Sequence, residues 1–359
     1  MTLVTTATNL PRLMKCIGSR LMPASLPEDH DAEAMTEGNA AHWLAQQLFN
    51  GADVPVGTKA YNGYVITDDM LEHVRTYLGA LDAGEMEVET TFAGDGWEVR
   101  ARADHIKYRD GVLTIDDFKY GWRIVSPVEN WTLLAHAMGW VQRNAVPVDN
   151  LRIVLRIHQP RPYHPDGPTR EWSCSYDQLV GYWHLLDVRL TTADDTLVAG
   201  LAQCAKCHAL ATCPVAREAS MNAIDATGLA FSDDLDEAQV AWEYETLNGA
   251  EGIIKARRDA LEELMTFRIK SGQVIPGYAL KQRQGQRRWM TGLSGAALSA
   301  AAGVDLTKDG LVTPAEAERR GVGKEVVTAL TERPNIGVKL ERVDADAMAR
   351  RVFGDGGQV

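Results

Sequence analysis

The sequence lacks a long hydrophobic run, which excludes one class of protein. No apolar stretch in the 359 residues approaches the roughly 20 residues that a transmembrane helix requires. The first ten residues, MTLVTTATNL, contain neither the basic segment nor the apolar segment that directs export. We therefore expect a protein that is neither inserted into a membrane nor exported, and that works in a cytoplasm.

Positive charge is also scarce. The chain has 37 lysines and arginines against 49 aspartates and glutamates, which gives a net charge of −12 at pH 7. Such a protein has no global positive field that attracts nucleic acid, so any contact with DNA must come from local basic clusters. The 45% hydrophobic content is sufficient for buried cores and excludes a disordered chain.

Cysteine is rare and unevenly distributed. The five cysteines are Cys16, Cys174, Cys204, Cys207 and Cys213. The last three lie within ten positions, and in a chain that is not exported this clustering favours a metal site over disulfides. A four-thiolate site needs one of the other two, and both zinc and iron–sulfur sites accept four cysteines. His208 is an alternative zinc ligand, and the simplest alternative is a set of free thiols.

The spacing of apolar residues predicts alternating helices and strands. A helical period recurs over residues 31–49, 67–81, 127–144, 176–195 and 236–270. A period of two over residues 85–92, 96–109 and 111–121 predicts an antiparallel meander, and residues 151–161 predict one further strand. The character of the chain changes after residue 216, so we expect a boundary near residue 220, with short helices towards the end.

The second hairpin of the meander carries the most informative residues. Asp117 and Lys119 share a strand face with Leu113 and Ile115, because side chains alternate along a strand. A turn near residues 109–111 would bring Asp104 beside Asp117. Two carboxylates at one strand end suit Mg²⁺ or Mn²⁺, and an adjacent lysine suits phosphodiester hydrolysis. The alternative is that these residues lie on the solvated face of an ordinary meander.

The first predicted helix carries the motif Glu37-Gly38-x-x-x-His42. A neutral imidazole at His42 can supply a further metal ligand, and Gly38 would let another backbone approach closely. Glu37 and His42 lie about 140° apart around the helix, so we do not expect both to bind one ion. A solvated or buried structural histidine is the alternative.

Together these motifs resemble a known family. Glu37 to His42, Ala103-Asp104 and Asp117 to Lys119, followed by a helix, look like the RecB-like branch of the PD-(D/E)XK nuclease superfamily. One cysteine before this core and C-x2-C-x5-C after it are similar to the iron–sulfur staple of that branch. The segments CIGS, IHQPRP and IPGYALKQRQGQRRW resemble a phage and prophage family of such nucleases.

The resemblance implies a fold and a division into domains. It implies an α/β, restriction-endonuclease-like core with a mixed central sheet flanked by helices over residues 1–220. Residues 221–359 would form a mainly helical region that binds DNA or a partner. The implied activity is that of a metal-dependent DNA exonuclease in phage replication or recombination, in the bacterial host cytoplasm and away from membranes. Phage replication or single-strand-binding proteins would be its partners.

The resemblance also implies roles for particular residues. The catalytic residues would be Asp104, Asp117 and Lys119, and the ligands of Mg²⁺ or Mn²⁺ would be His42, Asp104 and Asp117. A [4Fe–4S] cluster, with zinc as the alternative, would bind Cys16, Cys204, Cys207 and Cys213. Thr132 and His136 stand where the branch has Q-x-x-x-Y, on one face of the helix after the lysine.

Candidate DNA contacts follow from local charge and from these motifs. They are Glu37, Arg100, Arg102, Thr132, His136, Lys281, Arg283, Arg287, Arg288 and Trp289. The indole of Trp289 would stack on an unpaired base. Two other functions stay open, a nucleic-acid-binding protein without cleavage and a zinc-stabilised interaction module.

Overall fold

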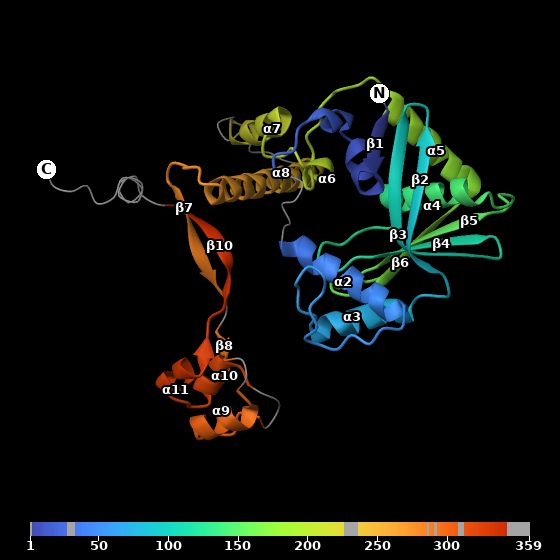
Figure 1. Ribbon diagram of the computed structural model, residues 1–359. Coiled ribbons are helices and arrows are strands. Elements are labelled where there is room, and N and C mark those ends of the chain that lie inside the picture. Colours follow the sequence, from blue (N-terminus) through green and yellow to red (C-terminus); the bar gives the residue numbers. More distant parts are fainter. Residues whose placement is uncertain are drawn as a thin grey trace. The chain divides into compact units, whose positions relative to one another are not determined.

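A mixed six-stranded sheet forms the centre of the larger of two units (Figure 1). The computed structural model describes residues 2–26, 33–225, 236–285, 287–290, 293–307 and 312–342. The chain separates into the units Met1–Arg258 and Asp259–Val359, and we describe each by itself. Within the described residues, every helix is too short or too polar to cross a bilayer.

The sheet of the first unit contains parallel and antiparallel pairs. Its strands are β1 (Leu3–Thr6), β2 (Glu85–Gly94), β3 (Trp97–Arg109), β4 (Val112–Phe118), β5 (Arg152–His158) and β6 (Thr169–Ser175). They follow the order β1-β3-β4-β5-β6, and β2 also pairs with β3. The pairs β1–β3 and β4–β5 are parallel and the others are antiparallel. The predicted meander of β2, β3 and β4 is therefore confirmed.

Helices cover the sheet through two hydrophobic clusters. Helices α4 (Trp131–Asn144) and α5 (Tyr176–Thr191) contribute to the larger cluster, which includes Leu113 and Ile115 of β4. Helices α2 (Glu33–Phe49) and α3 (Asp68–Gly79) contribute to the second, which includes Phe118. The predicted α/β fold, a mixed central sheet flanked by helices, is confirmed and is consistent with a PD-(D/E)XK-like core.

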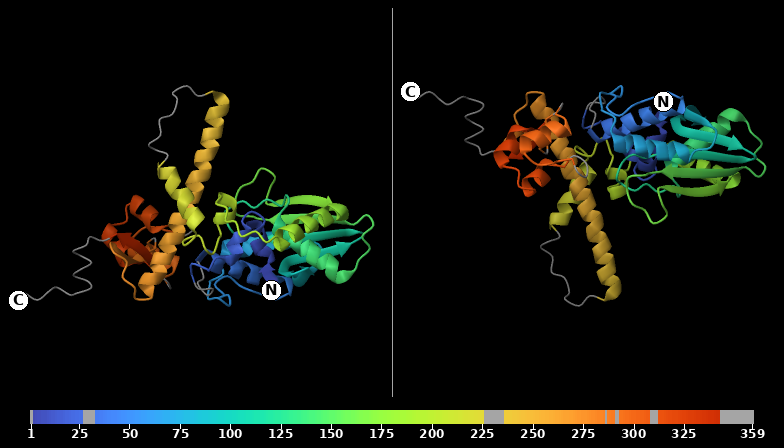
Figure 2. Two further views of the ribbon diagram at one scale, coloured as in Figure 1. Left: turned by 90° about the horizontal axis from the view of Figure 1, so that it is seen from above. Right: turned by 90° about the horizontal axis from the view of Figure 1, so that it is seen from below.

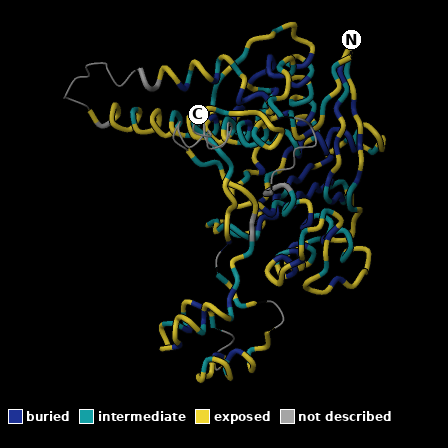
Figure 3. The backbone as a smooth tube through the Cα atoms, turned by 60° about the vertical axis from the view of Figure 1, so that its left-hand side comes forward, coloured by how far each residue is buried: buried dark blue, intermediate teal, exposed yellow. Residues whose placement is uncertain are grey.

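Short elements join the two ends of the nuclease-like region. Near the start lie η1 (Ala7–Asn9), α1 (Leu10–Leu13) and η2 (Ile17–Leu21), and after α5 lie α6 (Leu201–Cys204) and α7 (Pro214–Asp225). Contacts between α1 and α6 bring these distant segments together. Figure 3 shows the buried residues concentrated along the sheet and its helices.

The long helix α8 (Glu237–Lys270) runs across the unit boundary in sequence and is the straight helix in Figure 2. Within its described residues, the second unit then contains two small sheets and three short helices. The sheets pair β7 (Tyr278–Gln284) with β10 (Asn335–Arg342), and β8 (Arg288–Trp289) with β9 (Thr331–Glu332). The helices are α9 (Gly295–Ala302), α10 (Pro314–Arg319) and α11 (Lys324–Ala329). The short helices match the prediction, whereas the four strands were not predicted.

Candidate active site

The hairpin between β3 and β4 places two aspartates side by side. Asp110 and Gly111 both have positive φ angles, 51° and 76°, as the tight two-residue turn of a hairpin requires. The register pairs His105 with Asp116, so Asp104 and Asp117 face each other one position further along. The sequence predicts this juxtaposition, and the structure contains it.

Asp104 is held as a carboxylate by three neighbours. Its Oδ1 lies 3.4 Å from His42 Nδ1 of α2, and its Oδ2 accepts a 2.7 Å hydrogen bond from the Phe118 backbone N–H. Burial alone would raise the pKa of Asp104, but His42, Lys119 and the Phe118 N–H hold it well below its usual range. Burial likewise opposes protonation of His42, yet the Asp104 carboxylate raises the pKa of the imidazole.

Lys119 and Asp117 form an ion pair at the end of β4. Lys119 Nζ donates a 2.9 Å hydrogen bond to Asp117 Oδ1 and lies 2.8 Å from Asp117 Oδ2. The Oδ2 atom is buried and accepts no hydrogen bond within the described residues. Burial and the neighbouring Asp104 raise the pKa of Asp117, against the effect of Lys119. Both carboxylate oxygens of Asp117 therefore lie beside the Lys119 ammonium.

Glu87 of β2 is a site residue that the sequence analysis missed. Among the described residues, His42, Glu87 and Asp104 form the one group of three or more ligating side chains whose donor atoms all lie within 4.8 Å. Burial and the nearby Asp104 raise the pKa of Glu87, and Arg102 Nε lies 3.1 Å from its Oε2. The antiparallel pairing of Val88 with Ala103 sets Glu87 opposite Asp104, so the predicted meander contained a signal for it.

A cavity of about 510 Å³ contains these residues. Its lining comprises Thr8, Asn39, His42, Trp43, Gln46, Tyr61, Glu87, Glu89, Arg102, Asp104, Asp117, Lys119, Thr132 and His136. A second cavity of about 420 Å³ shares four of these residues and is also lined by Arg100. The predicted DNA contacts Arg100, Arg102, Thr132 and His136 thus line adjoining cavities.

His136 lies at the cavity in an uncharged state. Its side chain is almost fully buried, and Nδ1 has no hydrogen-bond partner within the described residues. Burial and the Lys119 ammonium lower the pKa of His136 to about 4, despite the opposing effect of Asp104. The imidazole is therefore neutral at physiological pH.

Glu37 and Gly38 have structural settings that differ from that of His42. Glu37 accepts bonds from Arg161 Nη1 at 2.9 Å and from the Tyr64 hydroxyl at 3.1 Å, away from the carboxylates of the site. The expectation that Gly38 admits a close backbone is wrong, because a Cβ there would meet nothing within 4 Å.

The loop after Lys119 is fixed by a buried glutamine. Gln159 Nε2 donates to the carbonyls of Gly121 and Arg123, both at 2.8 Å, and its Oε1 accepts from Val125 N at 3.1 Å. The Arg161 guanidinium lies 4.6 Å from the ring centroid of Trp122. These residues of the segment IHQPRP therefore hold the chain that follows Lys119.

A second buried polar cluster lies on β4 beside Asp117. Asp116 Oδ2 lies 2.9 Å from His105 Nδ1, and its Oδ1 lies 2.7 Å from His158 Nε2. Burial would raise the pKa of Asp116, but the two imidazoles hold it below its usual value. The cluster fixes strands β3, β4 and β5 to one another directly next to the site.

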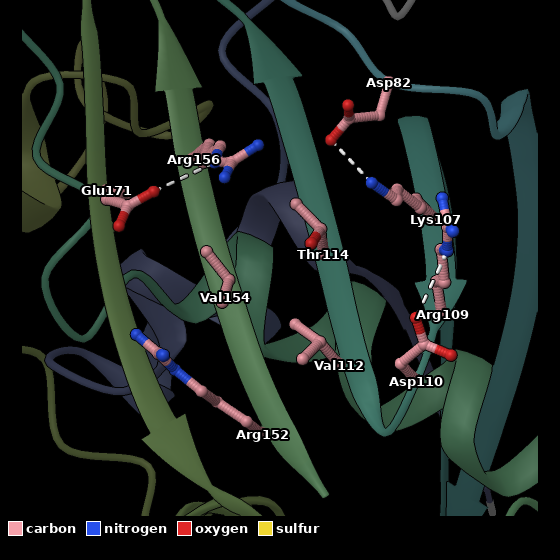
Figure 4. A pocket seen from close by; sticks show the side chains of 10 residues that line it. All are labelled: Asp82, Lys107, Arg109, Asp110, Val112, Thr114, Arg152, Val154, Arg156 and Glu171. Atoms are coloured by element: carbon pink, nitrogen blue, oxygen red, sulfur yellow. Dashed lines mark hydrogen bonds and ion pairs between the residues drawn. The ribbon is translucent and has the colours of Figure 1, made fainter.

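Figure 4 shows a different pocket, of about 350 Å³, on the strands that carry Thr114 and Val154. Three of its four basic side chains pair with acids, as in Lys107–Asp82 at 2.6 Å and Arg156–Glu171 at 3.0 Å. No residue that lines this pocket belongs to the candidate site.

The four cysteines of the predicted cluster line one small cavity. They are Cys16, Cys204, Cys207 and Cys213. Cys174 lies elsewhere, within the larger hydrophobic cluster, where burial raises its pKa to about 11. His208 is not among the residues that line the cysteine cavity.

The sulfur atoms of this cavity receive hydrogen bonds from both ends of the first unit. The Val198 backbone N–H donates to Cys16 Sγ at 3.3 Å, and Arg12 Nη1 lies 3.9 Å from Cys207 Sγ. Arg12 also contacts the His208 ring.

The second predicted basic cluster lies in the second unit and is largely neutralised. Ion pairs join Lys281 to Glu341, Arg287 to Glu318 and Arg288 to Glu332. Arg283 is exposed on β7. Trp289 packs against the small hydrophobic core of this unit, and its Nε1 donates to the Val312 carbonyl at 2.7 Å. The role of these residues as DNA contacts stays a prediction.

Comparison with known proteins finds similar solved structures, among them two crystal structures, and one family. The crystal structure named "Putative exonuclease" from Eubacterium rectale has 11% identity and a TM-score of 0.31, over 64% of this chain and 93% of that one. The crystal structure of SSO0001 has 14% identity and a TM-score of 0.30, over 60% and 88%. No curated protein matches. The family model described as "Protein of unknown function (DUF2800)" matches residues 6–340, so the chain belongs to this family.

Proposed function

We propose that this protein is a metal-dependent deoxyribonuclease of the PD-(D/E)XK type that degrades DNA as an exonuclease. The observation that carries the proposal is the group of Asp104, Asp117 and Lys119 beside the C-terminal end of β4, with His42 and Glu87 at the same cavity. Asp117 is buried, and Asp104 and Lys119 are partly buried. Buried charges of this kind are costly for folding unless they are paired, so they are a signature of a functional site.

The donor atoms at the cavity fit a hard divalent cation. His42, Glu87 and Asp104 offer one nitrogen and two carboxylate oxygens within 4.8 Å of one another, and the Asp117 carboxylate, paired with Lys119, lines the same cavity. Mg²⁺ and Mn²⁺ prefer oxygen ligands, and Mn²⁺ also accepts imidazole. When bound, such a cation lowers the pKa of a water molecule and neutralises charge on the phosphate.

The protein side chains orient the reacting groups. Lys119, held by Asp117, would position the attacking water or stabilise the negative charge that develops on the phosphate. Arg102, beside Glu87 in the cavity wall, would contact a phosphate of the bound strand. The water attacks phosphorus, and the bond to the leaving oxygen breaks.

For the cysteine cavity we propose a [4Fe–4S] cluster bound by Cys16, Cys204, Cys207 and Cys213. Four thiolates at one cavity suit zinc or an iron–sulfur cluster. The resemblance of C-x2-C-x5-C to the iron–sulfur staple favours the cluster. The cluster would be structural, and the enzyme would serve phage DNA replication or recombination in a bacterial cytoplasm.

The test is digestion of end-labelled single- and double-stranded DNA with Mg²⁺ or Mn²⁺, with protein purified without oxygen. We expect degradation from an end, and its loss in Asp117→Ala and Lys119→Ala. Asp166→Ala, at an exposed position outside the cavity, serves as the control and should retain activity. Intact DNA with both metals, bound equally by wild type and variants, would contradict the proposal and favour binding without cleavage.

A further inference from the structure

The cavity of the candidate site has an aromatic side that hydrolysis does not require. Tyr61 and Trp43 line it together with His42 and Asp104. Trp43 is partly buried and packs against the second hydrophobic cluster, whereas Tyr61 is 70% exposed. An aromatic ring at a catalytic cavity is thus left open to solvent.

The loop that carries Tyr61 is tied to helix α2. The Asn62 side chain donates a 2.7 Å hydrogen bond to the Thr36 carbonyl, and the Tyr64 hydroxyl donates to Glu37 at 3.1 Å. Both bonds fix the loop beside the helix that also carries His42. The position of Tyr61 at the cavity is therefore set by Asn62 and Tyr64, which follow it closely in the loop.

A DNA strand offers one flat, apolar group that matches an exposed ring, which is the nucleobase. Stacking of bases on aromatic side chains is tolerant of sequence and strong per base. Inside a duplex both faces of each base are covered by neighbouring bases, so only an unpaired base can insert its face beside Tyr61.

We propose that Tyr61, together with Trp43, stacks on an unpaired nucleobase next to the scissile phosphate, so that the enzyme acts on single strands or frayed ends in preference to intact duplex. This inference rests on the proposed nuclease function. It adds the substrate class and a specificity-determining residue that does not touch the reacting atoms.

The experiment measures the affinity of the whole protein for a fluorescent single strand and for a duplex of equal length, with Ca²⁺ in place of Mg²⁺ to prevent cleavage. We expect Tyr61→Ala to weaken single-strand binding about 5- to 140-fold, whereas Tyr61→Phe keeps the ring and the affinity. Tyr163→Ala removes a ring that is 87% exposed outside the cavity and should change nothing. Because Tyr61 is exposed, its replacement leaves the core intact.

A second arm places an abasic nucleotide along the strand. At one position of the strand, the abasic nucleotide should weaken binding by wild type as much as Tyr61→Ala does. The abasic nucleotide and Tyr61→Ala together should weaken binding no more than either change alone. If wild type cuts DNA but Tyr61→Ala binds the single strand normally, stacking is wrong and the nuclease proposal stands. Equal losses on single strand and duplex also overturn stacking. If wild type neither cuts nor binds DNA, the proposed function fails and this inference fails with it.

Discussion

At the scale of single residues, Glu87 combines strain with chemistry. Its φ angle of 54° is a left-handed conformation that a glutamate rarely adopts and that costs of order 1 kcal/mol or more. This backbone strain occurs at the residue whose carboxylate approaches Asp104 and His42. Backbone strain, partial burial and a raised pKa are properties that we expect of a metal ligand.

We predict that Glu87→Gln weakens Mn²⁺ binding by roughly tenfold or more, because one anionic oxygen is lost from the donor set. Isothermal titration with Mn²⁺ measures the change. Glu85→Gln, at an exposed position of the same strand outside the cavity, is the matched control and should bind Mn²⁺ as wild type does. Equal affinities for wild type and Glu87→Gln would exclude Glu87 as a ligand.

His136 gives a prediction about acid stability. Unfolded histidine takes up a proton near its ordinary pKa of 6.5, but the folded protein protonates His136 only at about pH 4. Between these values the unfolded state binds more protons, so stability falls as the pH falls. From about pH 7 to about pH 5 this one group lowers the unfolding free energy by about 2 kcal/mol.

Urea unfolding at both pH values measures this effect. His136→Gln should remove about that much of the pH dependence, whereas His184→Gln, at an exposed position of α5, should leave it unchanged. An identical pH dependence in wild type and His136→Gln would mean that the folded imidazole titrates normally.

The sequence predicts the site residues unequally, for a physical reason. Asp104, Asp117 and Lys119 follow from strand alternation and one hairpin, both of which are local. Glu87 needs in addition the register of β2 against β3 and a backbone angle that no pattern specifies. Local periodicity does not predict contacts between residues far apart in the sequence, such as the ion pair of Glu37 with Arg161.

At the scale of elements, two glycines of the predicted motifs play opposite parts. A Cβ on Gly18 would lie 2.2 Å from the Asp195 carbonyl oxygen, so the turn η2 can approach the 195–196 segment only with glycine there. Gly38 lies inside α2 with open space around it, where glycine merely weakens the helix.

We predict that Gly18→Ala destabilises the protein by about 1–3 kcal/mol, the usual cost of overpacking. Gly38→Ala should stabilise it by up to about 1 kcal/mol, through helix propensity. Thermal unfolding of both variants measures the two shifts in opposite directions. Similar shifts for the two would show that the close approach at Gly18 does not hold the segments together.

The elements that periodicity predicts best are those with strong apolar patterns. Helix α3 begins after Thr67, whose side chain accepts a bond from Met70 N, as its capping position predicts. Strand β1 was not predicted because its four residues are too few to set a period. Strand β6 was not predicted because its sequence, TREWSCS, is polar at most positions. The predicted helix over 31–49 starts within residues outside the described part of the chain; α2 is described from Glu33.

At the scale of the whole molecule, the cysteine cavity joins the beginning and the end of the nuclease-like region. Cys16 precedes every strand of the sheet except β1, and Cys204, Cys207 and Cys213 follow all six. A cofactor there would close a loop that spans the entire fold. In the chain-entropy model, a cross-link over a loop this long contributes about 5 kcal/mol.

We predict that Cys207→Ser loses the visible colour and bound iron of the protein and unfolds at a clearly lower urea concentration. Cys174→Ser, a buried thiol outside the cavity, is the control and should retain its iron. Metal analysis by mass spectrometry measures iron and zinc together. One zinc ion per chain and no iron would overturn the iron–sulfur proposal.

The position of Cys16 also determines when, during synthesis, the cysteine cavity can form. During synthesis Cys16 leaves the ribosome long before Cys204, Cys207 and Cys213, so the cavity that all four line cannot exist until the hairpin of β3 and β4 has been made. If those thiols bind the proposed cofactor, its delivery becomes the last step of maturation. A cell short of iron would then accumulate full-length but immature protein, and the supply of iron would control how much of the proposed activity is present.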